Sequence, residues 1–140
     1  MGPAAWVWCM DVLLHELETS IPEEMVEIIA YADDLACVFK ANTRKEITDH
    51  GTKVIELINK WFRSYHLRMS TSKTVAVLVK GSMNEKHLPT LKIYGKNVRY
   101  VNNVKYLGVI LDRGLTFAAH ARYLRAKVAE FMFSIKRVGA

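Results

Sequence analysis

The sequence has few of the residues that build cross-linked or metal-clustered folds. Its only two cysteines, Cys9 and Cys37, both lie in apolar runs, and no Cys/His cluster has the spacing of a zinc site. No apolar run approaches the roughly 20 residues needed to cross a bilayer, and no charged-then-apolar leader is present. We therefore expect a reduced, intracellular protein without a membrane partner. No import signal decides between nucleus and cytoplasm.

What the sequence does contain is apolar residues and positive charge. Of its 140 residues 51% are hydrophobic, which is enough to bury one core. A chain of this length is too short for several domains. The net charge of +6 favours a polyanionic partner such as nucleic acid. The alternative stays open, because many basic proteins bind no nucleic acid.

Periodicity predicts an α+β fold. A capping box formed by Thr43 and Glu46 marks the start of the second helix, which is expected to run to about residue 66. Asp112 follows a strand and precedes Arg113 and Gly114, and we expect it to form a turn. A polar segment over residues 81–89 is the predicted flexible loop. The other predicted helices cover residues 4–18 and 116–138. The predicted strands cover residues 26–29, 35–39, 74–79, 91–94, 98–100 and 104–111. Of these, 91–94 and 98–100 are expected to form a hairpin around a turn at 95–97.

The sharpest motif is Tyr-Ala-Asp-Asp at residues 31–34, between two short apolar strands. Its length is that of a tight hairpin, so Asp33 and Asp34 are expected at the turn, where their charges stay solvated. Carboxylate oxygens suit Mg²⁺, and two such ions about 4 Å apart stabilise both oxygens in phosphoryl transfer. Taken alone, however, Asp-Asp is also a common turn dipeptide.

The surrounding sequence resembles the reverse transcriptases of non-LTR retrotransposons. The tetrapeptide within residues 28–36 resembles motif C of that family. Upstream, residues 2–14 resemble the end of motif B and the following palm helix, and downstream, residues 61–74 resemble motif D. Residues 104–112 resemble the primer grip (motif E), and residues 115–120 the entry to the thumb. The segments occur in the family's order and together cover nearly the whole chain.

The resemblance implies roles for the residues near the turn. Asp33 would be the ligand shared by both Mg²⁺ (or Mn²⁺) ions of the complete enzyme, and Asp34 a weaker ligand or a partner outside the coordination sphere. Tyr31 would support the turn and face the end of the primer, although a space-filling cross-strand aromatic is an equal reading. Lys73 resembles the motif D lysine that protonates departing pyrophosphate, and its alternative is a solvated lysine before a strand.

Further residues are implied to contact nucleic acid. Tyr106, Leu107 and Gly108 would position the primer strand by backbone shape, although a bulge in a packed strand would also explain Gly108. Arg122 and Arg125, with the other cations of the last predicted helix, would follow a phosphate backbone, and the alternative is a solvated helix face. The partner of the parent enzyme would be an RNA template with a DNA primer.

The resemblance also implies what this chain lacks. Motif A, with its aspartate on the first palm strand, precedes motif B, whereas this sequence begins at the end of motif B. We therefore expect a partial, ferredoxin-like palm over residues 1–80, a primer-grip hairpin region over 81–113 and the start of the thumb over 114–140. The chain alone is expected to be inactive, and to self-associate or need a complementing polypeptide. The competing interpretations are a non-catalytic nucleic-acid-binding module and a merely structural α+β domain.

Overall fold

The structure is a computed structural model that describes residues 2–22, 24–79 and 87–138. Three long helices and eight short strands lie within these residues. The strands form four separate two-stranded sheets, of which three are antiparallel hairpins. The small α+β fold that the sequence predicts is thereby confirmed.

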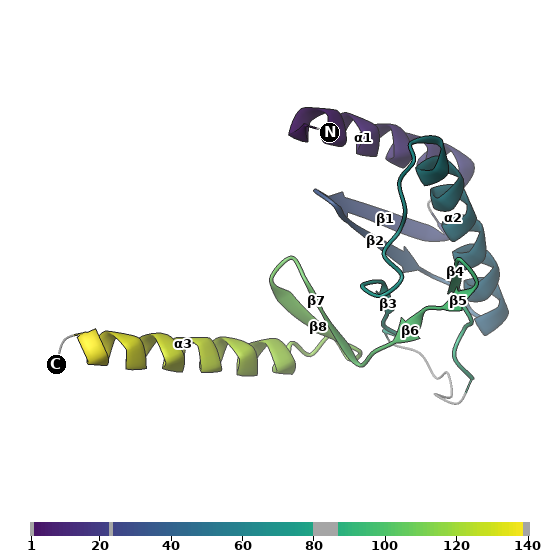
Figure 1. The fold of residues 1–140 in the computed structure, drawn as a ribbon. Coiled ribbons are helices and arrows are strands. Elements are labelled where there is room, and N and C mark those ends of the chain that lie inside the picture. Colours follow the sequence, from purple (N-terminus) through teal and green to yellow (C-terminus); the bar gives the residue numbers. More distant parts are fainter. Residues whose placement is uncertain (1, 23, 80–86, 139–140) are drawn as a thin grey trace. The chain divides into compact units, whose positions relative to one another are not determined.

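The chain divides into two compact units, which are described separately (Figure 1). The first unit, residues 1–74 with 83–98, holds the hairpin that carries the two aspartates. The second unit, residues 75–82 with 99–140, holds the last hairpin and the last helix. The three predicted domains remain a prediction.

The first unit begins with helix α1 (Pro3–Ser20), close to the predicted span of 4–18. Pro3 stands at the start of the helix, where its fixed φ and missing N–H cost nothing. The hairpin of β1 (Val26–Tyr31) and β2 (Asp34–Phe39) follows. Its antiparallel register runs from Val26 opposite Phe39 to Tyr31 opposite Asp34, so a turn of two residues joins the strands.

Helix α2 (Arg44–Ser64) begins at the predicted capping box. The Glu46 N–H donates to the Thr43 hydroxyl over 3.2 Å, and the Thr43 N–H donates to the Glu46 carboxylate over 3.3 Å. These bonds satisfy two backbone donors that a helix start leaves without partners. The helix ends two residues before the predicted limit.

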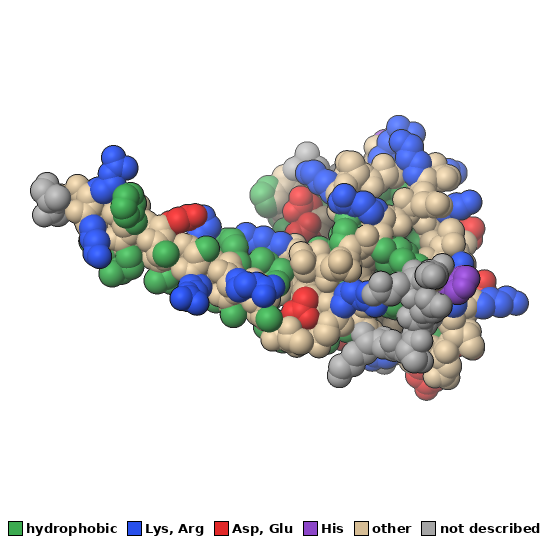
Figure 2. Space-filling model, turned by 90° about the horizontal axis from the view of Figure 1, so that it is seen from below, with side chains coloured by type: hydrophobic (Ala, Val, Ile, Leu, Met, Phe, Trp, Pro, Cys, Tyr) green, Lys and Arg blue, Asp and Glu red, His purple; other side chains and the backbone are tan. Residues whose placement is uncertain are grey.

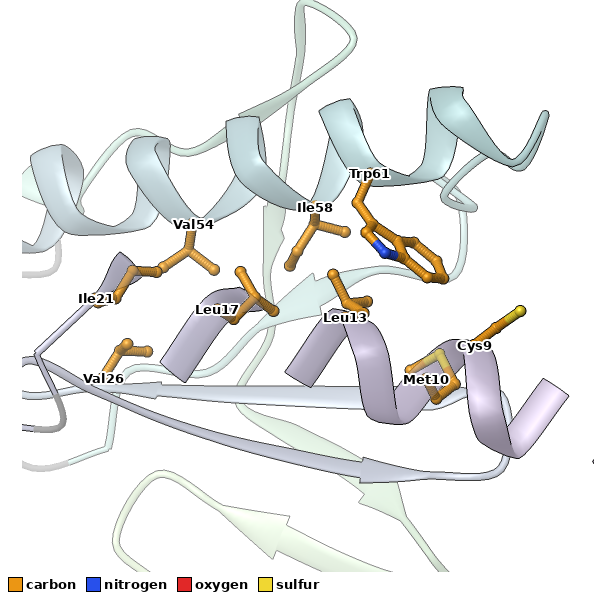
Figure 3. Packing of buried hydrophobic residues seen from close by; sticks show 9 residues of the cluster. All are labelled: Cys9, Met10, Leu13, Leu17, Ile21, Val26, Val54, Ile58 and Trp61. Atoms are coloured by element: carbon orange, nitrogen blue, oxygen red, sulfur yellow. The ribbon is translucent and has the colours of Figure 1, made fainter. Parts of the chain in front are cut away.

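The core of the first unit lies between the two helices and one face of the β1–β2 hairpin (Figure 3). Side chains of α2 point toward those of α1, and alternate residues of the strands pack beneath them. Leu13, Leu17 and Val54 are each only 1% exposed. Burying side chains of this kind stabilises a fold by about 1.5–3 kcal/mol each. The buried cluster comprises Cys9, Met10, Leu13, Leu17, Ile21, Val26, Val54, Ile58 and Trp61.

A short hairpin of β4 (Lys92–Ile93) and β5 (Lys96–Asn97) completes the first unit and corrects one prediction. The turn was expected at 95–97, with 98–100 as the returning strand. It lies instead at Tyr94 and Gly95, which both have positive φ, as a type I′ hairpin turn requires.

In the second unit, β3 (Val75–Ala76) pairs in parallel with β6 (Arg99–Tyr100). The predicted strand over 74–79 is thus reduced to two residues. The single strand predicted over 104–111 is wrong, because β7 (Asn103–Tyr106) and β8 (Val109–Asp112) form an antiparallel hairpin there.

Helix α3 (Ala118–Val138) ends the described chain, close to the predicted span, and none of its residues is buried. In Figure 2 its surface shows Lys and Arg side chains interspersed with apolar ones. None of the described helices is long and apolar enough to span a bilayer. Most of the predicted loop over 81–89 lies outside the described residues.

Candidate metal and nucleic-acid site

The two aspartates of the Tyr-Ala-Asp-Asp motif lie at the tip of the β1–β2 hairpin, as predicted. Asp33 is the second residue of the turn and Asp34 is the first residue of β2, and both are exposed. Ala32, the first residue of the turn, has a φ of +52°. This left-handed conformation costs a residue with a Cβ roughly 1–2 kcal/mol, so neighbouring contacts must hold it.

The strand alternation assigns the motif's other side chains to one face. Ala30 and Leu35 pack toward the helices, so Tyr31 and Asp34 project from the opposite, open face. Tyr31 is 63% exposed there, beside the partly exposed Ile29 and Val38. An aromatic side chain thus flanks the carboxylates on the face that α1 and α2 leave open.

The turn also accepts a hydrogen bond from a residue of helix α1 that lies 26 residues earlier in the sequence. The indole N–H of Trp6, in the first turn of α1, donates to the Ala32 carbonyl oxygen over 2.7 Å. The Trp6 side chain is partly buried and packs against the core cluster. Helix α1 is therefore joined directly to the tip of the β1–β2 hairpin.

The donor chemistry at the tip fits a hard divalent cation in part. Mg²⁺ is bound in proteins by one or two carboxylates, with water and substrate phosphates in the remaining positions. Asp33 and Asp34 supply two such carboxylates. Among the described residues, however, no group of three or more His, Cys, Asp or Glu side chains is placed to hold a metal ion. The tip can thus contribute ligands, but the described chain does not form a complete metal site.

Lys73 lies in a turn of the first unit and is exposed. The same turn is closed by Thr74, whose N–H and hydroxyl both donate to the Ser70 carbonyl, over 3.1 Å and 2.7 Å. No hydrogen bond or ion pair in the described part of the chain joins the Lys73 ammonium to either aspartate. Its role as a proton donor therefore remains a prediction.

The residues expected to grip a primer lie at the turn of the β7–β8 hairpin. Leu107 and Gly108 are its two turn residues, with φ values of +48° and +84°. A Cβ built on Gly108 would meet no described atom within 4 Å, so conformation rather than crowding favours glycine there. Gly108 thus belongs to a tight turn and not to a strand bulge. Tyr106 ends β7, and its buried hydroxyl has no partner among the described residues.

Sequence reasoning missed the contacts that join this hairpin to α3. The Lys105 ammonium donates to the Tyr123 hydroxyl over 3.0 Å and lies 4.6 Å from the centre of its ring. The hydrogen bond and charge of Lys105 lower the pKa of Tyr123. The Ile110 N–H donates to Nδ1 of His120, whose ring stacks on Tyr123. A lysine and a tyrosine 18 residues apart leave no local signal for such a pair.

The cations predicted to follow a phosphate backbone are accessible. Arg122 and Arg125 are both exposed on α3. Lys127, on the same helix, is paired instead with Glu130 over 3.0 Å. The Asp112 carboxylate accepts hydrogen bonds from the N–H groups of Gly114 and Thr116, so Asp112 forms the predicted turn. These donors, the Thr116 N–H first, lower the pKa of its carboxyl.

Comparison with known proteins identifies the family. A family model described as reverse transcriptase (RNA-dependent DNA polymerase) matches residues 1–111. The chain belongs to the reverse transcriptase family. Its relatives come from non-LTR retrotransposons, which confirms the resemblance seen in the sequence. No solved structure matches the chain significantly.

Three relatives illustrate the similarity. A putative 115 kDa protein in the type-1 retrotransposable element R1DM of Drosophila melanogaster is 32% identical over 137 residues, which cover 98% of this chain and 13% of that protein. A retrovirus-related Pol polyprotein from the R1 2 element of Nasonia vitripennis is 34% identical, covering 98% and 33%. The RNA-directed DNA polymerase from the Drosophila melanogaster mobile element jockey is 29% identical, covering 96% and 15%. The chain thus spans no more than a third of each of these three relatives.

Proposed function

We propose that this chain is the C-terminal palm and the start of the thumb of an RNA-directed DNA polymerase that extends a DNA primer on an RNA template. The proposal rests mainly on one observation. Asp33 and Asp34 lie exposed at the tip of a two-residue hairpin turn, inside the segment that the reverse transcriptase family model matches. A turn held by two paired strands fixes the directions of the two carboxylates.

The reaction is the attack of the primer's 3′-hydroxyl on the α-phosphorus of a nucleoside triphosphate. A new phosphodiester bond forms as the hydroxyl loses its proton to solvent water, and the bond to pyrophosphate breaks. Divalent cations, when bound, stabilise the attacking and departing oxygens. Asp33 would hold such cations through its carboxylate, and Asp34 would be a weaker ligand. Lys73 is proposed to give a proton to the departing pyrophosphate.

Under the same proposal, the primer end and the rest of the palm contact the face of the β1–β2 hairpin that α1 and α2 leave open. Both outer edges of the β1–β2 sheet are free of any described strand. Unpaired edges and the apolar side chains of Ile29 and Val38 favour pairing with a further strand. That strand lies outside residues 1–140 and would carry the further aspartate that the resemblance assigns to motif A. Two carboxylates alone hold two dications poorly against hydration and mutual repulsion, so the isolated chain is proposed to be inactive.

In the second unit, the β7–β8 turn and α3 are proposed to contact the primer and template. Leu107 is 47% exposed at the turn and can lie against a sugar-phosphate strand. Exposed Arg122 and Arg125 can neutralise phosphates, which makes binding dependent on salt. A non-catalytic nucleic-acid-binding module would use these same contacts without chemistry, and it is the second candidate function.

The deciding experiment complements this chain with the segment that precedes the matched region in the R1DM relative, and measures template-directed DNA synthesis with Mg²⁺. We expect synthesis from the complex and none from either part alone. Asp33→Ala should reduce the rate at least 100-fold, because it removes the proposed ligand shared by both ions. Asp49→Ala, at an exposed aspartate of α2, is the matched control and should keep the rate within about twofold.

The alternatives give different results. A well-folded complex that binds primer and template but makes no DNA would favour the non-catalytic module. Synthesis that survives Asp33→Ala would refute the assignment of the hairpin tip to metal binding.

A further inference from the structure

The tip of the β1–β2 hairpin is held by a side chain 26 residues away in sequence. Trp6 Nε1 donates to the Ala32 carbonyl at 2.7 Å, which is short for an N–H···O bond. From this geometry we propose that Trp6 is a positioning residue for the aspartates, and that its indole fixes the turn from which Asp33 projects. The inference rests on the proposed function of that turn and adds a residue outside the aspartate motif.

The peptide group explains why this bond acts on Asp33. The Ala32 carbonyl and the Asp33 N–H belong to one planar unit, so holding the oxygen fixes the direction in which Asp33 leaves the turn. Two-residue hairpin turns that begin with a positive φ occur in two types, which differ in the rotation of this central peptide. Ala32 carries a Cβ, so its φ of +52° is unfavourable on its own. The Trp6 bond to its carbonyl oxygen is proposed to hold this peptide in one of the two orientations.

Trp6 is itself well supported. The side chain is partly buried against the core cluster, so packing restricts its rotamer before it meets the turn. Its backbone N–H donates to the Gly2 carbonyl over 3.1 Å, which places it in the first hydrogen-bonded turn of α1. A rigid element with a packed side chain holds a neighbouring group more accurately than a solvated loop does. Movement of α1 would therefore reach Asp33 through a single bond.

The chain offers a matched control two residues away. Trp8 lies on the same helix but is 63% exposed. Trp6→Phe removes the N–H and keeps an aromatic ring, and Trp8→Phe makes the same chemical change away from the turn. Benzothienylalanine at position 6 replaces only the N–H by sulfur and so preserves shape, which covers the case that Trp6→Phe disturbs folding.

The first measurement uses the chain alone. In ¹⁵N relaxation the Asp33 amide should be as rigid as the strands in the parent chain, with an order parameter of about 0.85. We expect Trp6→Phe and the benzothienylalanine variant to lower it toward about 0.6 and to shift the Ala32 and Asp33 resonances, and Trp8→Phe to leave both unchanged. Unchanged order at Asp33 in the benzothienylalanine variant, with an unchanged melting temperature, would overturn the proposal.

The second measurement uses the complemented polymerase. Loss of one hydrogen bond should raise the Mg²⁺ concentration for half-maximal synthesis by about three- to tenfold, with the affinity for primer-template unchanged. An equal change in Trp8→Phe, or none in the position 6 variants, would overturn the positioning role. If Asp33→Ala retains full synthesis, the proposed function fails, whereas the ordering of the turn by Trp6 is decided by the relaxation experiment alone.

Discussion

Tyr31 and Asp34 are cross-strand partners at the last pair of the β1–β2 hairpin, and both project from the face that α1 and α2 leave open. Residues directly opposite each other on one face have Cβ atoms about 5 Å apart, so the ring lies beside the carboxylate. Asp33 follows in the turn itself. The hairpin therefore presents one aromatic and two acidic side chains together at its tip.

This arrangement predicts weak cation binding by the chain alone. Mn²⁺ titrated into the isolated protein should broaden the resonances of residues 31–34 selectively, at millimolar rather than micromolar concentrations, because two carboxylates are an incomplete ligand set. The double substitution Asp33→Asn with Asp34→Asn should abolish the effect, whereas Asp49→Asn should not. Uniform broadening across the protein would contradict a specific site at the tip.

A second prediction concerns the contact between α2 and the segment before β4. A Cβ built on the buried Gly51 would collide with the side chain of Leu91, which is itself only 8% exposed. Gly-to-Ala in a helix usually stabilises by about 0.5–1 kcal/mol, but overpacking costs about 1–3 kcal/mol. Gly51→Ala should therefore lower the free energy of unfolding by about 1–2 kcal/mol in urea melts.

The partner of that contact supplies the control. When Gly51→Ala is combined with Leu91→Ala, the loss should be smaller than the sum of the two single losses, because the collision is gone. Thr52→Ala, exposed on the same helix, should change stability by less than about 0.5 kcal/mol. Strict additivity would show that the two residues do not touch.

A third prediction follows from Cys37, whose side chain packs against the core cluster. Burial raises the pKa of its thiol from 9.0 to about 11. The folded protein thus keeps this proton at pH values where the unfolded chain has lost it. The associated stability is complete below pH 9 and is lost as the pH rises toward 11.

Two measurements check this prediction. Iodoacetamide should modify Cys37 at pH 8 about 100-fold more slowly than it modifies the unfolded chain, because the thiolate fraction is lower. The fall in melting temperature between pH 9 and 11 should be shallower in Cys37→Ala. A native thiol that reacts as fast as the unfolded one would contradict its burial.

A fourth prediction concerns Asp112, whose carboxylate accepts the N–H groups of Gly114 and Thr116 and the Thr116 hydroxyl. These donors, the Thr116 N–H first, lower the pKa of the carboxyl below its ordinary 3.8. Its contribution to stability is present above pH 3.8 and is lost as the pH falls through the lowered value. Asp112→Ala should therefore increase amide exchange at the start of α3 at neutral pH.

An NMR titration at low pH is the control for this prediction. In the parent chain, the Thr116 amide resonance should follow the titration of Asp112, and this movement should be missing in Asp112→Ala. A Thr116 resonance that titrates identically in both proteins would rule out the bond.

The sequence allowed prediction of those parts of the fold whose signals are local. The Thr43 and Glu46 capping box lies within one turn, and the strands on either side of Asp33 are short and sharply bounded, so both were located correctly. The β7–β8 hairpin was missed because residues 104–111 form a nearly continuous apolar run. Leu107 gives no sign of a turn, since a leucine rarely adopts the positive φ that it has there.

The candidate site follows the same rule. The exposed position of Asp33 and Asp34 was predictable from the motif and its flanking strands. The bond from Trp6 to Ala32 was not, because it joins an indole to a backbone carbonyl far along the chain. The hydrogen bond from Lys105 to Tyr123 was not predictable for the same reason, because the two residues lie 18 positions apart. Tertiary contacts of this kind depend on how elements pack, which no short pattern records.

Helix α3 has a consequence for how this protein behaves when it is handled. Its large apolar side chains are exposed to solvent, with Phe131 and Phe133 at 65% and 64% exposure. Beyond its first turns the helix depends on side-chain pairs three or four residues apart, each of which contributes only a few tenths of a kcal/mol. Its far end should fray first on warming and adhere first to detergents or column matrices. Shielding it should therefore be the first aim in purification.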